Sequence, residues 1–224
     1  MEYVLFTETL EELKKHAKKT DAVLVGFSGG KDSLVCLDLC VRVFKKVVPF
    51  FMYLVPDIEI CNQALEYAKE RYGLPVIQYP HWLIFRLLKY GIYCDYNEKN
   101  NQEIPELKIN DIHKAIVHDT GIPLVCWGAK KSDSMWRRRY FSINKFDQVC
   151  YPLKEWNKQD VFAYLRLNKI PIPDTAGVTA SGIDLSTKPV LWLHDKYPED
   201  YAKIKEIFPF VEAIVKRREF YGIK

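Results

Sequence analysis

The sequence contains no apolar run long enough to cross a membrane, and its first residues lack the basic region and apolar core of a secretion signal. We therefore expect a cytoplasmic protein with no membrane partner. Its 224 residues, 48% hydrophobic and 28% charged, suit one globular domain with an elaboration. The net charge of +4 does not require a nucleic-acid partner, although it suits an anionic small molecule.

The six cysteines include no Cys-x-x-Cys pair. This absence argues against a zinc ribbon, a thioredoxin-like motif and the usual iron–sulfur spacings, so neither zinc nor an iron–sulfur cluster is expected. Cys36 and Cys40 share one helix face, and Cys126 lies in an apolar run. The thiols are predicted to be buried and inert in a reducing compartment, with Cys94 and Cys150 the least clearly buried.

The most informative segment is a glycine turn, Ser28-Gly29-Gly30-Lys31-Asp32-Ser33. It joins the apolar residues 22–27, a predicted strand, to residues 34–44, a predicted helix. Glycines let the backbone approach an anion, and the helix N-terminus adds N–H groups and a favourable dipole. Lysine adds a full positive charge and the two serines add hydroxyl donors. The alternative, that the turn only reverses the chain, is less favoured because these side chains have no use in packing.

The turn lacks two features of an ordinary P-loop. That motif requires glycine where this chain has Val25, and serine or threonine where it has Asp32. The turn instead resembles the signature of the PP-loop ATP pyrophosphatases. That superfamily includes ATP sulfurylase small subunits, phosphoadenylylsulfate (PAPS) reductases, GMP synthetases and tRNA-modifying adenylating enzymes. The resemblance implies that residues 28–33 grip a pyrophosphate and that ATP is cleaved between its α and β phosphates.

Strand and helix patterns alternate along the chain. Helices are predicted at 8–19, with Thr7 as N-cap, and at 62–72, 82–90 and 111–119; strands are predicted at 47–55, 74–79 and 123–127. This order predicts an α/β fold with a doubly wound, mostly parallel sheet and helices on both faces. The resemblance implies the same Rossmann-like, adenine nucleotide alpha hydrolase-like class. The polar residues 91–109 are either a mobile substrate loop or a surface excursion.

A basic segment, residues 128–139, follows the predicted strand 123–127 and carries five basic groups. Such a run is either a solvated helix face or an anion site at the carboxyl end of a strand. It resembles the Gly-x-Arg-x-x-Glu-Ser-x-x-Arg segment of PAPS reductases and ATP sulfurylase small subunits. The matching residues are Gly128, Lys130, Asp133, Ser134 and Arg137. Lysine replaces an arginine here and supplies a point charge rather than a bidentate fork, which weakens any transfer of substrate specificity.

The resemblance continues through residues 151–171, which are similar to the family's Pro-Leu-x-x-Trp-x-x-x-Asp-Val-x-x-Tyr-Leu stretch before Ile-Pro. Asn157 is the predicted N-cap there, and this stretch is assigned packing rather than catalysis. The resemblance covers about residues 20–175. We therefore expect a nucleotide-binding domain at 1–175, which includes the N-terminal helix, and a C-terminal loop and helical appendage at 176–224 packed on the same domain.

The resemblance implies a role for each matched residue. Lys31, Lys130 and Arg137 are the expected catalytic cations, and Asp32 is the expected Mg²⁺ contact. The nucleotide is expected to contact residues 28–33 together with Gly128, Asp133 and Ser134. PAPS reductases use a cysteine near the C-terminus, whereas the last cysteine of this sequence is Cys150, so the reductase chemistry is not expected.

The expected reaction is transfer of AMP from ATP to an oxyanion acceptor such as sulfate, with release of pyrophosphate. Two alternatives remain open. One is a PAPS- or APS-binding reductase relative with altered thiol chemistry, and the other is a non-catalytic nucleotide-binding subunit of a complex. The sequence leaves open the acceptor and whether the chain forms a homo-oligomer or joins a partner subunit.

Overall fold

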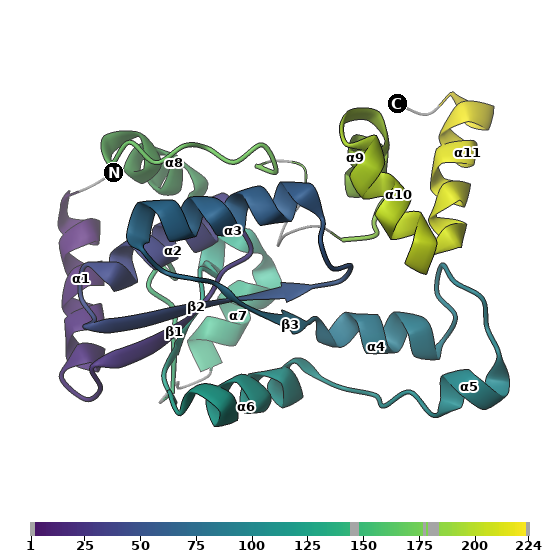
Figure 1. Cartoon of the computed structure of the whole chain (residues 1–224). Helices are drawn as coiled ribbons and strands as arrows, with labels where there is room; N and C mark the ends of the chain where they lie inside the picture. Colours follow the sequence, from purple (N-terminus) through teal and green to yellow (C-terminus); the bar gives the residue numbers. More distant parts are fainter. Residues whose placement is uncertain (1–2, 144–147, 177, 179–183, 223–224) are drawn as a thin grey trace. The chain divides into compact units, whose positions relative to one another are not determined.

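The computed structural model describes residues 3–143, 148–176, 178 and 184–222. Helices alternate with strands and flank a sheet (Figure 1). The strands are β1 (Ala22–Gly26), β2 (Lys46–Tyr53), β3 (Ile77–Pro80), β4 (Val125–Cys126) and β5 (Val149–Cys150). The α-helices are α1 (Tyr3–Ala17), α2 (Lys31–Val41), α3 (Glu59–Tyr72), α4 (Trp82–Lys89), α5 (Glu98–Gln102), α6 (Ile109–Thr120), α7 (Met135–Ile143), α8 (Lys158–Leu167), α9 (Thr187–Lys196), α10 (Pro198–Ile207) and α11 (Glu212–Tyr221).

The sheet has the strand order β3-β2-β1-β4-β5. β1 pairs in parallel with β2 on one side and with β4 on the other, and β4 pairs in parallel with β5. The chain thus builds the sheet outward from β1 in one direction and then in the other. This order confirms the predicted α/β, doubly wound, mostly parallel fold. The two-residue β5 was not predicted, because so short a strand leaves no periodic pattern.

The carboxyl ends of β1 and β4 define the place where strand order reverses. In open parallel sheets, ligands bind at such a switch point, beyond the carboxyl ends of the strands. The glycine turn follows β1, and the basic segment follows β4. The topology therefore brings the two segments to the same edge of the sheet.

The described residues divide into two compact units. The first takes its residues from 1–51, 65–77 and 120–176, and the second from 52–64, 78–119 and 177–224. The predicted division near residue 175, with a C-terminal appendage packed on the same domain, stays a prediction. Residues 52–64 and 78–119 belong to the same compact unit as the C-terminal helices, which the sequence pattern did not indicate.

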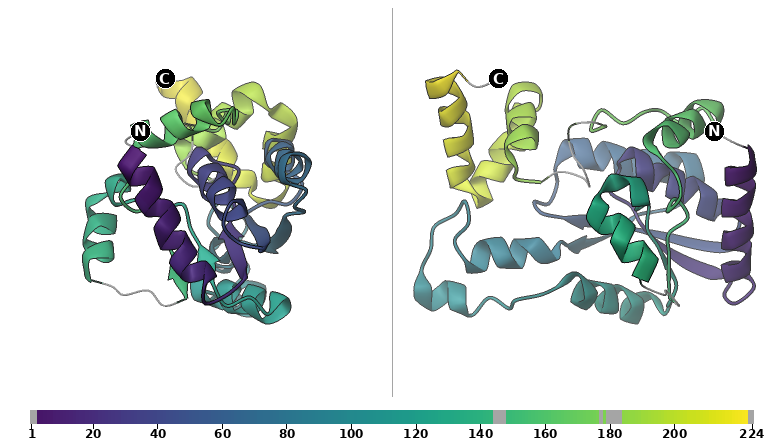
Figure 2. Two further views of the ribbon diagram at one scale, coloured as in Figure 1. Left: turned by 90° about the vertical axis from the view of Figure 1, so that its left-hand side faces the viewer. Right: turned by 180° about the vertical axis from the view of Figure 1, so that it is seen from behind.

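The core of the first unit surrounds α2, whose residues from Ser33 to Cys40 are all buried. Helix α1 adds Leu13 to this core, and Trp156 donates a hydrogen bond from its ring Nε1 to Thr9 Oγ1 at 2.9 Å. This helix faces the viewer in the left view of Figure 2. The prediction that it starts after a Thr7 cap is wrong: α1 begins at Tyr3, because Leu5 and Phe6 also pack on the core and draw the helix upstream.

A buried carboxylate fixes α2 against its neighbours in the first unit. Asp38 accepts hydrogen bonds from Tyr72 of α3, from Tyr164 of α8 and from Arg42, the C-cap residue of α2. Only 5% of Asp38 is exposed, so this charge requires the partners it has. The network holds the helix that carries the glycine turn at its N-terminus.

The second unit has its own apolar core, which includes Leu87, Val190, Leu193 and Phe208. Asp200 of α10 accepts hydrogen bonds from the backbone N–H groups of Glu59 and Ile60, at 2.6 and 3.0 Å, where α3 begins. Residues 91–109 contain the short helix α5. Within the described ranges, no helix has both the length and the apolar character needed to span a membrane.

The prediction that Cys94 and Cys150 are the least buried cysteines is wrong. Cys94 is 7% exposed within the core of the second unit, and Cys150 is 2% exposed in β5. The half-buried thiol is that of Cys61 in α3. Packing against other segments covers both thiols, and the neighbouring residues in the sequence do not record that packing.

Candidate functional site

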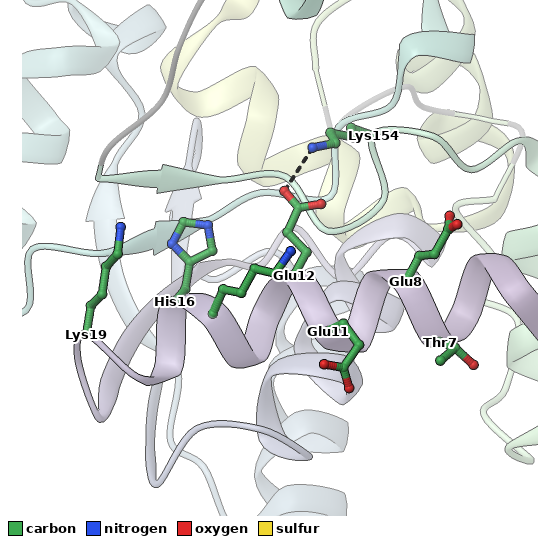
Figure 3. Close-up of a pocket in the computed structure, with 8 residues that line it drawn as sticks. Thr7, Glu8, Glu11, Glu12, His16, Lys19 and Lys154 are labelled. Atoms are coloured by element: carbon green, nitrogen blue, oxygen red, sulfur yellow. Dashed lines mark hydrogen bonds and ion pairs between the residues drawn. The ribbon is translucent and has the colours of Figure 1, made fainter.

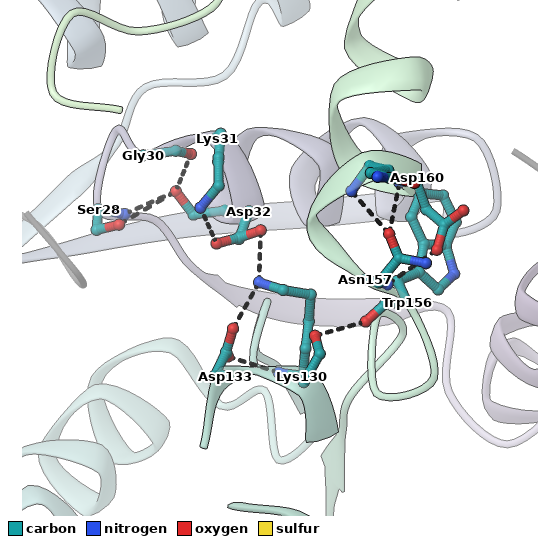
Figure 4. Close-up of polar contacts among 12 residues, drawn as sticks. Ser28, Gly30, Lys31, Asp32, Lys130, Asp133, Trp156, Asn157 and Asp160 are labelled. Carbon is teal, nitrogen blue, oxygen red and sulfur yellow. Dashed lines mark hydrogen bonds and ion pairs between the residues drawn. The ribbon is translucent and has the colours of Figure 1, made fainter. Parts of the chain in front are cut away.

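The glycine turn is a tight connection between β1, which ends at Gly26, and α2, which begins at Lys31 (Figure 4). Gly29 has a φ of +70°, a left-handed conformation that a side chain would strain. Gly30 occupies the N-cap position of α2 in an extended conformation, and no side chain caps the helix there. The first N–H groups of α2 are therefore available to an anion.

The two serines of the turn fix its shape. Ser33 Oγ donates a hydrogen bond to the carbonyl oxygen of Gly30 at 2.9 Å and accepts one from the N–H of Ser28 at 3.2 Å. The two hydroxyl oxygens lie 3.3 Å apart. Ser33 is buried whereas Ser28 is half-buried. Ser33 thus closes the turn, and the Ser28 hydroxyl lies nearer the surface, where it can donate to a ligand.

Gly128 allows the basic segment to touch the glycine turn. A Cβ atom at this position would lie 2.7 Å from the carbonyl oxygen of Asp32, closer than real Cβ contacts come. Gly26 permits a similar approach, because a Cβ there would lie 2.3 Å from the ring of Trp127. The first residues after β4 therefore lie directly against the first residues of α2.

Two lysines and two aspartates form a charge cluster where the segments meet (Figure 4). Lys31 Nζ lies 2.7 Å from Asp32 Oδ2, and Lys130 Nζ lies 2.6 Å from Asp32 Oδ1. Lys130 Nζ is also 2.9 Å from Asp133 Oδ1, and the Lys130 backbone N–H donates to Asp133 Oδ2 at 2.9 Å. We call Lys31, Asp32, Lys130 and Asp133 the charge quartet.

The quartet is partly shielded from water. Lys130 is only 2% exposed, and the side chains of Lys31 and Asp32 are each 20% exposed. Two positive and two negative charges cancel, which is how a buried ammonium group is tolerated. An entering phosphate would replace the carboxylates as the partner of both lysines, since it offers the same charge-assisted contact.

Asp32 fits a Mg²⁺ ion only if it gives up a lysine partner. Mg²⁺ prefers carboxylate oxygens, and the buried Asp32 Oδ1 has no aligned hydrogen-bond donor among the described residues. Yet an ammonium group lies within 2.7 Å of each oxygen of this carboxylate, and its charge would repel a cation. The arrangement therefore does not fit a resident ion, and the expectation that Asp32 contacts Mg²⁺ stays a prediction.

Backbone carbonyl groups of residues 154–156 accept hydrogen bonds from the basic segment and fix its position. The N–H of Lys131 donates to the carbonyl oxygen of Lys154 at 2.8 Å, and Ser132 Oγ donates to that of Trp156 at 2.9 Å. Trp156 is buried, and Asn157 directly after it caps α8, where its side chain accepts from the N–H groups of Gln159 and Asp160. These are packing and capping contacts, and they position Lys130 without adding a reactive group.

Ser134 and Arg137 were also predicted to belong to the site, but among the described residues neither side chain bonds to the glycine turn. Ser134 Oγ accepts a hydrogen bond from the N–H of Arg137 at 3.1 Å and so caps α7. The Arg137 side chain lies near Tyr151, where its charge acts to lower the tyrosine's pKa against the larger raising effect of burial. Over residues 3–143 and 148–176, no hydrogen bond or ion pair joins either side chain to the glycine turn.

A group that the sequence did not indicate lies elsewhere in the first unit. Glu12, His16 and Cys150 each offer a ligand atom, and these atoms lie within 4.8 Å of one another. The spacing of four residues between Glu12 and His16 is the signal that points to a shared helix face. The cysteine is distant in the sequence, so only the fold joins the three.

A comparison with known protein families finds a match that includes both segments. The family model described as "Phosphoadenosine phosphosulfate reductase domain" matches residues 22–174, which contain both the glycine turn and the basic segment. This match confirms the resemblance drawn from the motifs. No curated protein matches the chain by sequence.

Two solved structures share the fold. An NH3-dependent NAD synthetase from Campylobacter jejuni, in complex with the nitrate ion, is 13% identical; the match covers 100% of this chain and 98% of that one, with a TM-score of 0.55. A phosphoadenylyl-sulfate reductase from Candida auris, in a phosphate complex, is 18% identical; the match covers 77% of this chain and 87% of that one, with a TM-score of 0.52. At these identities the likeness shows the fold alone.

Proposed function

Since the chain belongs to the phosphoadenosine phosphosulfate reductase domain family, we propose that it is an enzyme that binds ATP and cleaves it between the α and β phosphates. The AMP unit passes to an oxyanion acceptor, with sulfate the first candidate, and pyrophosphate leaves. The observation that carries this proposal is the convergence of Lys31 and Lys130 on one carboxylate beside the open N-terminus of α2.

The glycine turn would bind the β and γ phosphates as one unit. Gly29 and Gly30 bring the backbone close, the first N–H groups of α2 point at the phosphate oxygens, and Ser28 adds its hydroxyl. Lys31 then exchanges Asp32 for a phosphate oxygen. This site grips the part of ATP that becomes pyrophosphate, and the α phosphate lies at its edge.

The second lysine would face the reacting phosphorus. An oxygen of the acceptor attacks the α phosphorus, the bond from that phosphorus to the bridging oxygen breaks, and the electron pair leaves with pyrophosphate. The acceptor is already an anion, so the step needs no protein nucleophile and no general base. Lys31 and Lys130 neutralise charge that grows on the leaving group, and such preorganised charges are a major source of catalysis.

Mg²⁺ would neutralise further charge on the polyphosphate when bound, since ATP carries it in most such reactions. Asp32 is the proposed protein contact, once the phosphates have drawn off Lys31 and Lys130. Arg137 is proposed to serve the acceptor. Gly128, Asp133 and Ser134 would shape the wall of the site next to the nucleotide.

Product analysis tests the bond that is cleaved. ATP labelled at the α phosphate is incubated with the full chain, Mg²⁺ and one acceptor at a time, sulfate first. We expect AMP or an adenylyl adduct together with pyrophosphate, and none of these products from a Lys31→Ala variant. ADP with orthophosphate would contradict the proposal. Absence of turnover with every acceptor, despite ATP binding, would instead favour a non-catalytic nucleotide-binding subunit.

The runner-up is a PAPS- or APS-binding reductase relative, which the name of the matching family favours. Such a reaction needs a reactive thiolate. Cys61 is the half-buried thiol, but burial and then the charge of Asp200 raise its pKa to about 12. We expect no covalent adduct at Cys61, Cys94 or Cys150 by intact-protein mass spectrometry during turnover, and full activity in a variant with Cys94→Ser and Cys150→Ser. Sulfite production from PAPS would support the reductase.

A further inference from the structure

A second polar site lies on the first unit, away from the glycine turn. It is an open pocket of about 610 Å³ along one face of α1, and Glu12, His16 and Lys154 are among its lining residues (Figure 3). None of the residues that line this pocket belongs to the charge quartet. Glu11 of the same helix points away from Glu12 and His16. The proposed transfer of AMP leaves these groups without a role.

Three different donor atoms gather beside this pocket, and two of them belong to residues that line it. Glu12 and His16 are one helical turn apart on α1, and Cys150 ends β5 at the edge of the sheet. A carboxylate oxygen, an imidazole nitrogen and a thiol sulfur lie within 4.8 Å of one another. The helix and the strand supply these donors from two rigid elements, so little movement separates the observed positions from a ligand cage.

The kind of donor selects the kind of ion. Mg²⁺ and Ca²⁺ take oxygen ligands and do not favour sulfur, whereas Zn²⁺ accepts thiolate, imidazole and carboxylate together. Three protein ligands leave one tetrahedral position for water or an anion.

Burial also favours a small ion over a larger reactant. Cys150 is 2% exposed and His16 is half-buried, so the sulfur is shielded from large reagents. A ring nitrogen of His16 and the sulfur of Cys150 lie within 4.8 Å of each other, close enough for one small ion to contact both.

The charges around the group are mixed. Lys154 Nζ lies 2.8 Å from Glu12 Oε1, and Lys15 and Lys19 also line the pocket, with Glu8 and Glu11 as the remaining carboxylates. An ion would share the Glu12 carboxylate with Lys154 through its second oxygen, as outer partners of metal ligands commonly do.

We propose that Glu12, His16 and Cys150 bind one Zn²⁺ ion, with a water molecule as the fourth ligand. This ion ties the N-terminal helix to the edge strand β5. The proposal departs from the expectation that no zinc is bound, which rested on Cys-x-x-Cys spacing. The three residues come from segments far apart in the chain, and no spacing rule covers them.

Metal binding is measured on the full chain after treatment with a chelator. Zn²⁺ is titrated calorimetrically, and Co²⁺ serves as a probe, because a thiolate ligand gives cobalt an intense charge-transfer absorption. We expect one equivalent of either metal per chain and the charge-transfer band with Co²⁺. Cys150→Ser should abolish the band, and His16→Gln should weaken Zn²⁺ binding at least tenfold. Cys94→Ser and His118→Gln are the matched controls and should bind as the parent does.

Two outcomes would overturn the proposal. One is a parent chain that takes up no stoichiometric Zn²⁺. The other is equal Zn²⁺ affinity in the parent, Cys150→Ser and His16→Gln. If circular dichroism shows that Cys150→Ser does not fold, Zn²⁺ binding by His16→Gln and Glu12→Gln tests the proposal instead. Both side chains are half-buried, so these substitutions disturb the fold less. AMP transfer by the metal-free chain is measured alongside, so that loss of this site is not confused with loss of the nucleotide site.

Discussion

Lys31 lies in the first turn of α2, where its ammonium group is the positive charge contributed by the glycine turn. We expect Lys31→Ala to weaken ATP binding tenfold or more, because a charge-assisted contact contributes about 1.5–3 kcal/mol. Stability without ligand should change by less than about 1 kcal/mol, since the lost ion pair is partly solvated and Lys130 still faces Asp32. Titration calorimetry measures the affinity.

Lys45→Ala is the control for that variant. Lys45 is exposed and also forms a single ion pair, with Asp21. The control should bind ATP as the parent does. Equal affinity for ATP in Lys31→Ala and the parent would remove the glycine turn from the binding site.

Asp32 has two possible roles that a single substitution separates. If it only neutralises the lysines, Asp32→Asn should tighten binding of pyrophosphate measured without Mg²⁺, because the competing negative charge is gone. If it also contacts Mg²⁺, the same variant should need more Mg²⁺ for half-maximal turnover. We expect both effects. Turnover with an unchanged Mg²⁺ dependence would exclude Asp32 as the metal contact.

Substitution of Lys130 and substitution of Arg137 should have different effects on turnover and stability. Lys130 is buried and holds two carboxylates, so Lys130→Met should reduce both turnover and stability, the latter by up to about 3–5 kcal/mol, the range for breaking a buried ion pair. Arg137→Ala should lower turnover while ATP affinity stays. Steady-state kinetics at saturating ATP and urea unfolding give the two readouts. Normal turnover in Arg137→Ala would assign that arginine to a solvated helix face.

At the scale of elements, the notable contacts are those that fix helix ends. Asp200 of α10 caps the start of α3 in the second unit and is 1% exposed. Backbone N–H groups at the start of a helix that lose their acceptor lower the stability of the protein, and the loss is larger when they are buried.

We expect Asp200→Ala to lower the free energy of unfolding by about 1–2 kcal/mol. This should shift the melting temperature down by roughly 2–4 °C per kcal/mol for a chain of this size. Glu199→Ala, the exposed neighbour in the same helical turn, is the matched control and should change little. Equal stability of the two variants in urea would show that the cap contributes nothing.

The elements also show where prediction from sequence succeeds. Asn157 was predicted to cap a helix, and the structure confirms this at the start of α8, because capping is a local interaction encoded by neighbouring residues. The start of α1 and the strand β5 were missed. The start of α1 depends on packing against a segment more than a hundred residues away. The strand β5 depends on pairing with β4, which lies 24 residues earlier, and no local pattern records either contact.

At the scale of the whole molecule, ligand binding should raise the free energy of unfolding. A ligand present at 100 times its dissociation constant adds about 2.7 kcal/mol to the free energy of unfolding. ATP should therefore raise the melting temperature of the parent and slow hydrogen exchange first in residues 28–33 and 128–134. Lys31→Ala at the same ATP concentration is the control. An equal temperature rise in parent and variant would place the nucleotide elsewhere.

The sequence by itself determined the fold class, the family and the two segments that meet at the proposed site. Each of these rests on local features: alternating apolar periodicity, glycines where a turn needs them, and basic residues after a strand. Gly29 at a positive φ is such a case, since the backbone conformation and the residue type specify each other.

Only the tertiary structure decided which side chains meet. It joined Lys130 to Asp32, buried Cys94 and Cys150, and brought Cys150 close to His16. Within the described part of the chain it gave the side chains of Ser134 and Arg137 no hydrogen bond or ion pair to the glycine turn. These pairs lie on different strands and helices. Their contacts depend on strand order and on packing distances of a few ångströms, which residue types and spacing along the chain do not specify.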